Sequence, residues 1–169
     1  GIYMTVLPYY RDRAVAYARQ WALHRNPAYY DFESLGGDCT NFASQCVFAG
    51  SRIMNFTPTF GWYYIDANQK APAWTGVEYF WNFFTRKTFS IGPVGEVSAL
   101  EQMRPGDIVQ LSFKGGSFQH SPVVVSVGAV PTLENVLVAA HSYDADNRPL
   151  STYEFRDIRF LHITGTVRP

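Results

Sequence analysis

Three segments in the first half of the chain carry apolar residues three or four positions apart, the spacing typical of one face of an α-helix. These segments are residues 9–25, 39–49 and 75–87. The second has the most complete pattern, and its apolar positions are Cys39, Phe42, Ala43, Cys46 and Val47. Asp38 is a suitable N-cap and Gly50 a suitable residue after the last turn, so this segment is predicted to be a buried helix.

From about residue 107 the helical spacing gives way to short segments rich in β-forming residues. The predicted strands are residues 108–113, 121–127, 135–140, 150–155 and 159–166. Helices followed by a series of strands predict an α+β fold, with N-terminal helices packed on a C-terminal antiparallel sheet of about five strands. Residues 51–74 contain turn formers and isolated aromatic residues and give no assignment. No linker or repeat divides the chain, so residues 1–169 are predicted to form one domain.

The composition excludes several classes of protein. Fourteen basic and fourteen acidic residues balance without forming a basic stripe, so a nucleic-acid partner is not expected. No run of about 18 apolar residues is present, so no membrane span is expected. Four histidines and two cysteines are too scattered for a zinc pattern, and no metal or organic cofactor is expected. Aromatic residues make up 17% of the chain, which indicates an aromatic core or a ligand groove with stacking surfaces.

Cys39 is the first candidate for chemistry because it lies in the first turn of the predicted helix. The unpaired N–H groups of a helix N-terminus favour a thiolate and can bind an oxyanion. Gly36 and Gly37, just before it, allow a substrate backbone to approach closely. The alternative interpretation is that Cys39 is a small buried apolar residue. Cys46 lies in the middle of the same helix and is predicted to be core, too far along the helix to form a disulfide with Cys39.

Two histidines have positions that suit an acid or base. His120 follows a glycine-rich loop and begins a predicted strand, and His141 ends the next predicted strand. If these strands form a hairpin, both histidines lie at the same edge of the sheet. An unperturbed pKa of about 6.5 makes histidine suitable for proton transfer at neutral pH. His24, at a helix end, and His162, within the last predicted strand, are interpreted as structural.

The sequence from Asp38 to Gln45, DCTNFASQ, followed by Ala49 and Gly50, resembles the DCTNF-x-SQ-x-x-x-AG signature of the Putative amidase domain family. That family belongs to the papain-like group that includes the NlpC-type and CHAP amidases. The resemblance spans residues 9–153 and is weakest at 51–100. Its further matching segments are residues 10–17, 26–29, 104–107, 120–121 and 141–142.

The resemblance implies a papain-like cysteine peptidase fold, in which a cysteine-bearing helix packs against an antiparallel sheet that carries a histidine and a third polar residue. Carried over by matching motif, the catalytic residues are Cys39, His120 and His141. In the wider group a tyrosine upstream of the cysteine supports the oxyanion, and Tyr29 or Tyr30 is the corresponding residue here. Asp38 is grouped with these tyrosines as a candidate for the oxyanion or substrate site.

The residue that orients His120 depends on the register of the predicted hairpin. One register places His141 opposite His120, and a shift of one residue places Ser142 there and turns His141 to the other face. The spacing leaves both registers open, and only the resemblance favours His141. Asp144, in the turn that follows, is the alternative third residue.

These residues predict a cysteine-dependent amidase or peptidase that hydrolyses an amide bond through a thioester intermediate. The resemblance implies a peptide or peptidoglycan-type substrate and an extracellular or cell-envelope location, with the export signal removed. A monomer is expected. The alternatives are a binding module for cell-wall fragments without catalysis, and an acyltransferase in which an amine replaces water.

Overall fold

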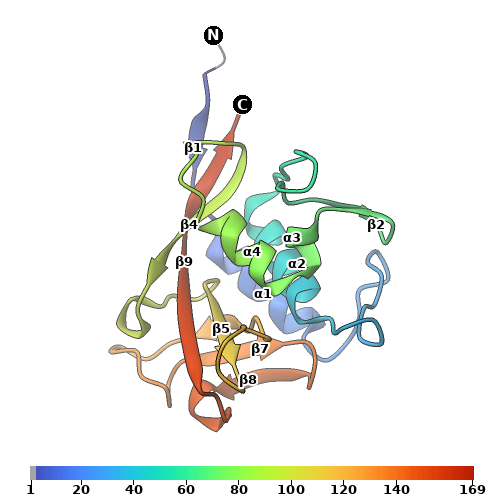
Figure 1. Ribbon diagram of the computed structural model, residues 1–169. Coiled ribbons are helices and arrows are strands. Elements are labelled where there is room, and N and C mark those ends of the chain that lie inside the picture. The colour runs from blue at the N-terminus through green and yellow to red at the C-terminus, as the bar shows by residue number, and fades with distance from the viewer. Residues whose placement is uncertain (1–2) are drawn as a thin grey trace.

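The computed structural model describes residues 3–169, and in this part of the chain four helices pack against one side of a curled antiparallel sheet (Figure 1). The helices are α1 (Arg11–Trp21), α2 (Cys39–Ser51), α3 (Pro72–Thr75) and α4 (Val77–Phe84). Two short 3-10 helices cover Leu100–Gln102 and Leu150–Thr152. Helix α2 lies in the middle of the helical layer, so its N-terminal end is held by both the helices and the sheet.

The strands form one large sheet and one small hairpin. They are β1 (Thr5–Leu7), β2 (Tyr64–Asp66), β3 (Gln69–Lys70), β4 (Gly92–Ser98), β5 (Ile108–Ser112), β6 (Val123–Ser126), β7 (Leu137–Ala140), β8 (Ala145–Pro149) and β9 (Asp157–Arg168). The large sheet has the order β1–β9–β5–β6–β7–β8, with β4 also paired to β9, and β2 pairs with β3 alone. All pairs are antiparallel.

The long strand β9 joins the two halves of the large sheet. Strand β4 pairs along one edge of β9, whereas on the other edge β5 pairs as far as Leu161 and β1 pairs from Thr166 onward. Between these two strands, Asp107 accepts the N–H of Ile163 at 3.0 Å and Arg11 donates to the carbonyl of Ile163. Two side chains therefore satisfy backbone groups of β9 where no strand does so.

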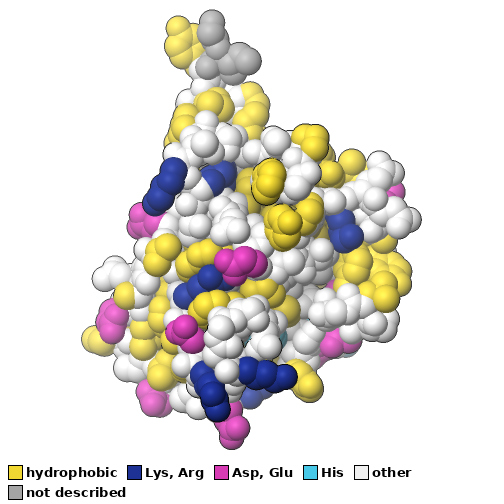
Figure 2. Space-filling view, in the orientation of Figure 1, with side chains coloured by type: hydrophobic (Ala, Val, Ile, Leu, Met, Phe, Trp, Pro, Cys, Tyr) yellow, Lys and Arg dark blue, Asp and Glu magenta, His cyan; other side chains and the backbone are white. Residues whose placement is uncertain are grey.

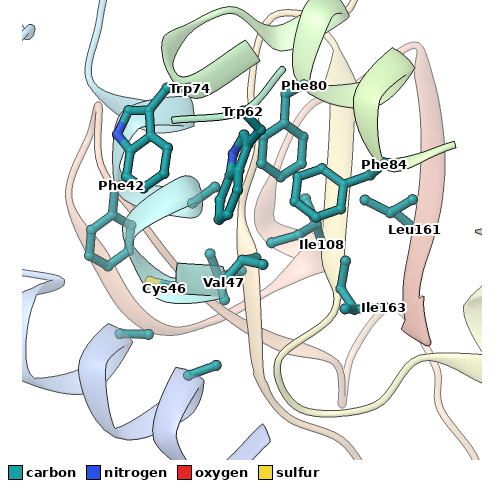
Figure 3. Packing of buried hydrophobic residues seen from close by; sticks show 14 of the residues in the cluster. Phe42, Cys46, Val47, Trp62, Trp74, Phe80, Phe84, Ile108, Leu161 and Ile163 are labelled. Atoms are coloured by element: carbon teal, nitrogen blue, oxygen red, sulfur yellow. The ribbon is translucent and has the colours of Figure 1, made fainter. Parts of the chain in front are cut away.

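Apolar side chains are buried on both faces of the sheet. On the side that faces the helices, the rings of Trp62, Phe80 and Phe84 pack with Ile108 and Leu161 (Figure 3). The opposite face buries a smaller cluster made of Met103, Val109, Leu111, Val124, Val136, Val138, Leu150 and Tyr153. Burial on both faces explains why β5, β6 and β7 are nearly continuous apolar runs rather than alternating patterns.

The structure confirms the α+β fold and corrects several predicted elements. The large sheet has seven strands rather than about five, because the sequence pattern does not predict β1 or β4. Residues 150–155 are not a strand but begin with a 3-10 helix, and the strand β8 precedes them. The helix predicted at 75–87 is α4 alone, separated from α3 by Gly76 in an extended conformation. Cys46 is fully buried in the core, as predicted.

The surface carries charges of both signs. On the face shown in Figure 2, basic and acidic side chains are interspersed, and apolar side chains lie between them. Over residues 3–169, no helix combines the length and apolarity that crossing a membrane requires.

Replacement of Asp107 by alanine is expected to destabilise the fold by about 3 kcal/mol or more, because a buried charge pair would lose one partner. Asp107 is fully buried and also contacts Arg11 Nη1 at 2.8 Å, the N–H of Arg104 at 2.9 Å and His162 Nδ1 at 2.9 Å. Urea unfolding of Asp107→Ala would measure the loss. Exposed Glu101→Ala is the matched control, and similar stabilities of the two variants would contradict the assignment.

Candidate active site

Cys39 is the first residue of α2, and its thiol lies at the end of the helix beside the sheet. The Sγ atom is 3.7 Å from the hydroxyl of Thr40 and 3.7 Å from the carbonyl oxygen of Gln119. Because Gln119 immediately precedes His120, the structure brings the chain segment of the predicted base to the predicted nucleophile. Only 8% of Cys39 is exposed.

The polar residues of α2 fix this helix among its neighbours. The hydroxyl of Thr40 is 3.0 Å from that of Ser121, which joins the helix tip to the start of β6. Asn41 accepts the indole N–H of Trp74 at 3.0 Å. Further along, Ser44 accepts the indole N–H of Trp62 and Gln45 accepts the hydroxyl of Tyr17. Most polar side chains of the DCTNFASQ segment are therefore buried and make hydrogen bonds that hold the helix in place.

Asp38 occupies the N-cap position, but its carboxylate does not cap α2. One oxygen accepts the N–H of Phe32 at 2.9 Å and the amide of Asn41 at 2.8 Å, and the other contacts His141. Burial raises the pKa of the Asp38 carboxyl, but these hydrogen bonds outweigh burial, so its pKa lies below the ordinary value. At 1% exposure, Asp38 is a buried structural anion rather than a group that faces substrate, contrary to the sequence-based expectation.

Both ring nitrogens of His141 are engaged by oxygen atoms. Nε2 lies 2.7 Å from the carbonyl oxygen of Trp21, which can only accept, so Nε2 carries a proton. Nδ1 lies 2.6 Å from the ionised carboxylate of Asp38, which is also an acceptor. The buried ring of His141 also stacks on the ring of Phe42, with centres 4.0 Å apart. Neither nitrogen remains to orient His120, and the structure does not place His141 in the predicted position of the third catalytic residue.

The strand register explains the position of His141. Val123 of β6 pairs with Ala139 of β7. This pairing follows the register in which Ser142, rather than His141, would continue opposite His120. Strand β7 ends at Ala140 and His120 pairs with Leu111 instead, so the expected pairing of His141 with His120 is not formed.

Asp144, the alternative third residue, is also engaged elsewhere. Arg25 donates to its two oxygens at 2.7 and 3.2 Å. The same guanidinium lies 3.3 Å from Asp31 and 3.5 Å from Glu33. These contacts hold the loop before α2 against the turn after β7, which is a structural role.

His120 lies at a pocket of about 660 Å³ that Gln119, Tyr143, Arg148 and Tyr153 also line. Its ring centre is 5.6 Å from that of Tyr153. Burial, and then the positive charge of Arg148, lowers the pKa of His120 from 6.5 to about 4. The imidazole is therefore neutral at neutral pH and able to accept a proton.

The thiol of Cys39 is neutral as well. Burial raises its pKa, and this outweighs the opposite effect of hydrogen bonds from the Thr40 hydroxyl and from the N–H groups of Ser121 and Thr40. The helix N-terminus was expected to favour a thiolate, and the correction is that desolvation dominates. The resting site thus holds a neutral thiol and a neutral imidazole.

The two tyrosines predicted to support the oxyanion lie in different surroundings. Tyr29 stacks on Trp74 with ring centres 6.1 Å apart. Burial raises its pKa, and this outweighs the lowering by Arg52, which follows the far end of α2. Its hydroxyl is therefore directed away from Cys39. Tyr30 is half-exposed and packs against Phe32, and its contribution to an oxyanion site stays a prediction.

Sequence reasoning missed Arg148 and Tyr153 as members of the site. Both follow β7 in segments that were interpreted as a turn and a strand, and no local signal directs them toward His120. Over residues 3–169, no group of three or more histidine, cysteine, aspartate or glutamate side chains is placed to hold a metal ion.

A thiol at a helix tip, beside the chain segment that carries a buried histidine, is an arrangement that suits a hydrolase. The chain belongs to the family described as Putative amidase domain, which it matches over residues 8–164. Membership indicates an amidase, and hence a hydrolase.

The chain is also similar to the Uncharacterized protein YhbB of Bacillus subtilis (strain 168), with 33% identity over 145 residues. This match covers 83% of the chain and 43% of YhbB, so the chain spans less than half of that relative's length. No solved structure matches the chain significantly.

The lowered pKa of His120 predicts a pH dependence of stability. A histidine that binds its proton less well in the folded state contributes stability above about pH 6.5, and this stability is lost as the pH falls toward 4. Between pH 6.5 and 5 the loss from His120 is expected to be about 2 kcal/mol. Urea unfolding should show a smaller acid loss in His120→Gln than in the wild type. His24→Gln, at an exposed site, should keep the full loss, and equal slopes in all three proteins would refute the assignment.

His141→Gln is expected to destabilise the fold by about 1–3 kcal/mol, because the buried carboxylate of Asp38 would lose a close hydrogen-bond partner. Unfolding in urea measures the effect, and His24→Gln should stay within about 0.5 kcal/mol of the wild type. A fully stable His141→Gln variant with strongly reduced turnover would instead return His141 to a catalytic role.

Proposed function

We propose that the protein is a cysteine-dependent amidase in which Cys39 is the nucleophile and His120 the general base and acid. The observation that carries this proposal is the position of the Cys39 thiol at the tip of α2, 3.7 Å from the carbonyl of the residue before His120. Both side chains are neutral, as is required before a proton moves from a thiol to an imidazole. Family membership supports the amide as the bond broken.

The first half of the reaction forms a thioester. The thiol proton moves from Sγ of Cys39 to a ring nitrogen of His120, and the sulfur attacks the carbonyl carbon of the amide. The N–H groups in the first turn of α2, which the Asp38 side chain leaves uncapped, stabilise the negative charge on the acyl oxygen. His120 then gives its proton to the leaving nitrogen as the carbon–nitrogen bond breaks.

The second half releases the acid. Water loses a proton to His120 and attacks the thioester carbon, and the carbon–sulfur bond breaks. The proton returns from His120 to the sulfur, so the thiol and the imidazole are regenerated. Each step uses side chains of this chain and water.

The same features support a papain-like arrangement. A cysteine begins a buried helix, and a histidine pairs with Leu111 of the antiparallel sheet just before β6 begins. The hydrogen bond between Thr40 and Ser121 fixes the helix tip relative to that strand. The third residue differs from the resemblance, since His141 serves the structure.

We further propose a peptide or peptidoglycan-type substrate and a place outside the cytoplasm or in the cell envelope. Support comes from the resemblance to cell-wall amidases and from the volume of the pocket, about 660 Å³, which suits a short peptide segment.

Cys39→Ala is expected to abolish amide hydrolysis while the melting temperature stays near that of the wild type, because the thiol makes only long contacts. Digestion of purified peptidoglycan, with mass spectrometry of the products, measures the activity and identifies the bond. Cys46→Ala is the matched control, since it removes a thiol from the same helix outside the site. It should retain turnover per folded molecule.

Near-normal hydrolysis by Cys39→Ala would rule out the proposed mechanism. An amine added to the reaction distinguishes the acyltransferase alternative, because products joined to the amine would replace the free acid. A protein that binds peptidoglycan but releases no fragments would be a binding module instead.

A further inference from the structure

The proposed reaction places a positive charge on His120 for which the resting site shows no partner. His120 is 5% exposed, and within residues 3–169 neither ring nitrogen makes a hydrogen bond. Burial and the charge of Arg148 both oppose the imidazolium. A hydrogen-bond acceptor beside the ring is therefore needed when His120 takes the thiol proton.

The polar neighbours of the pocket are mostly committed to other contacts. The side-chain oxygen of Gln119 accepts the N–H of Phe113 at 3.0 Å. The hydroxyl of Ser142 donates to Glu33 at 3.0 Å. Both nitrogens of His141 are occupied, as described above. Each of these groups already has a partner that holds it in a direction set by another contact.

Tyr153 is the polar side chain that packs directly against His120. Its ring lies 5.6 Å from the His120 ring at an angle of 56°, and 8% of the residue is exposed. Its hydroxyl is buried and has no hydrogen-bond partner in the described part of the chain. A buried hydroxyl without a partner costs about 1–3 kcal/mol, so such a group calls for a functional explanation.

Arg148 does not supply the missing partner. Its guanidinium lies over the face of the Tyr153 ring, 3.6 Å from the centre, and donates twice to Thr152. Burial raises the pKa of Tyr153, the charge of Arg148 and its close approach to the hydroxyl lower it, and nearby Cys39 raises it, with a net increase. The approach of Arg148 lies outside the geometry of a regular hydrogen bond. The phenol therefore stays neutral, and its oxygen can accept a hydrogen bond. Glu154, the carboxylate at this pocket, is exposed and does not contribute to the low pKa of His120.

We infer that Tyr153 is the positioning residue for His120, and that its hydroxyl oxygen accepts a ring N–H of the imidazolium. This inference rests on the proposed function, because it requires His120 to be the base. The proton moves from Cys39 Sγ to one ring nitrogen, and the N–H on the other nitrogen binds Tyr153. The phenol neither gains nor loses a proton, so it acts through His120 alone.

The test follows alkylation of Cys39 by iodoacetamide over a range of pH, with mass spectrometry of the peptide that contains it. Only the thiolate reacts, and at about pH 7 it forms by proton transfer to His120. Tyr153→Phe is expected to slow alkylation about tenfold or more at this pH. As the pH rises through the thiol pKa, the rate should approach that of the wild type, because the base is no longer needed.

Two further proteins separate positioning from a structural effect. Tyr79→Phe, which changes a half-exposed tyrosine that does not line this pocket, should react like the wild type. In a His120→Gln background, Tyr153→Phe should cause no further loss, since the two residues act as a unit. Wild-type reactivity of Tyr153→Phe, an equal loss at every pH, or a further loss in the His120→Gln background would overturn the inference.

The outcomes also separate this inference from the proposed function. If His120→Gln reacts as fast as the wild type and Cys39 reacts no faster than Cys46, the proposed function itself fails. If His120→Gln is slow and Tyr153→Phe is not, only the role of Tyr153 fails. Melting temperatures are measured for each variant, and Tyr153→Phe should be as stable as the wild type because it removes an unsatisfied hydroxyl.

Discussion

The buried contact between Asp38 and His141 is the interaction on which the rest of the site depends. Asp38 precedes α2 and His141 follows β7, while the carbonyl of Trp21 at the end of α1 binds the second ring nitrogen. The carboxylate also fixes the N–H of Phe32 in the loop before α2. Charges removed from water require nearly complete hydrogen bonding, and this network provides it. The helix tip is therefore fixed by polar contacts as well as by apolar packing.

Charge is divided between two neighbouring groups of residues. The ionised carboxylate of Asp38 is structural, whereas Cys39 and His120 near it are held neutral by burial. Because Asp38 binds His141, its carboxylate stays away from the first N–H groups of α2. In the proposed reaction, the negative charge on the acyl oxygen meets these N–H groups and no competing anion. The contact between Asp38 and His141 thus keeps a negative charge away from the N–H groups of the helix tip.

Local signals explain what the sequence could predict. The apolar stripe of α2 and the position of Cys39 depend on neighbouring residues, so both were predictable. The register that separates His141 from His120 depends on contacts distant in the sequence, and a shift of one residue reverses the outcome. Strand β4, with the sequence GPVGEVS, has little intrinsic strand preference and exists through its pairing with β9. The position of Tyr153 beside His120 could not be predicted, because it follows a 3-10 helix where the sequence pattern indicated a strand.

The central place of β9 in the sheet has a consequence for folding during translation. Strands β1, β4 and β5 all pair with β9, although β9 is the last of the four to be translated. Until it leaves the exit tunnel, β1 and β4 lack their partner, and their open edges are exposed to other nascent chains. The domain therefore completes its sheet only after β9 has been translated. The time needed for translation determines how long β1 and β4 stay without their partner.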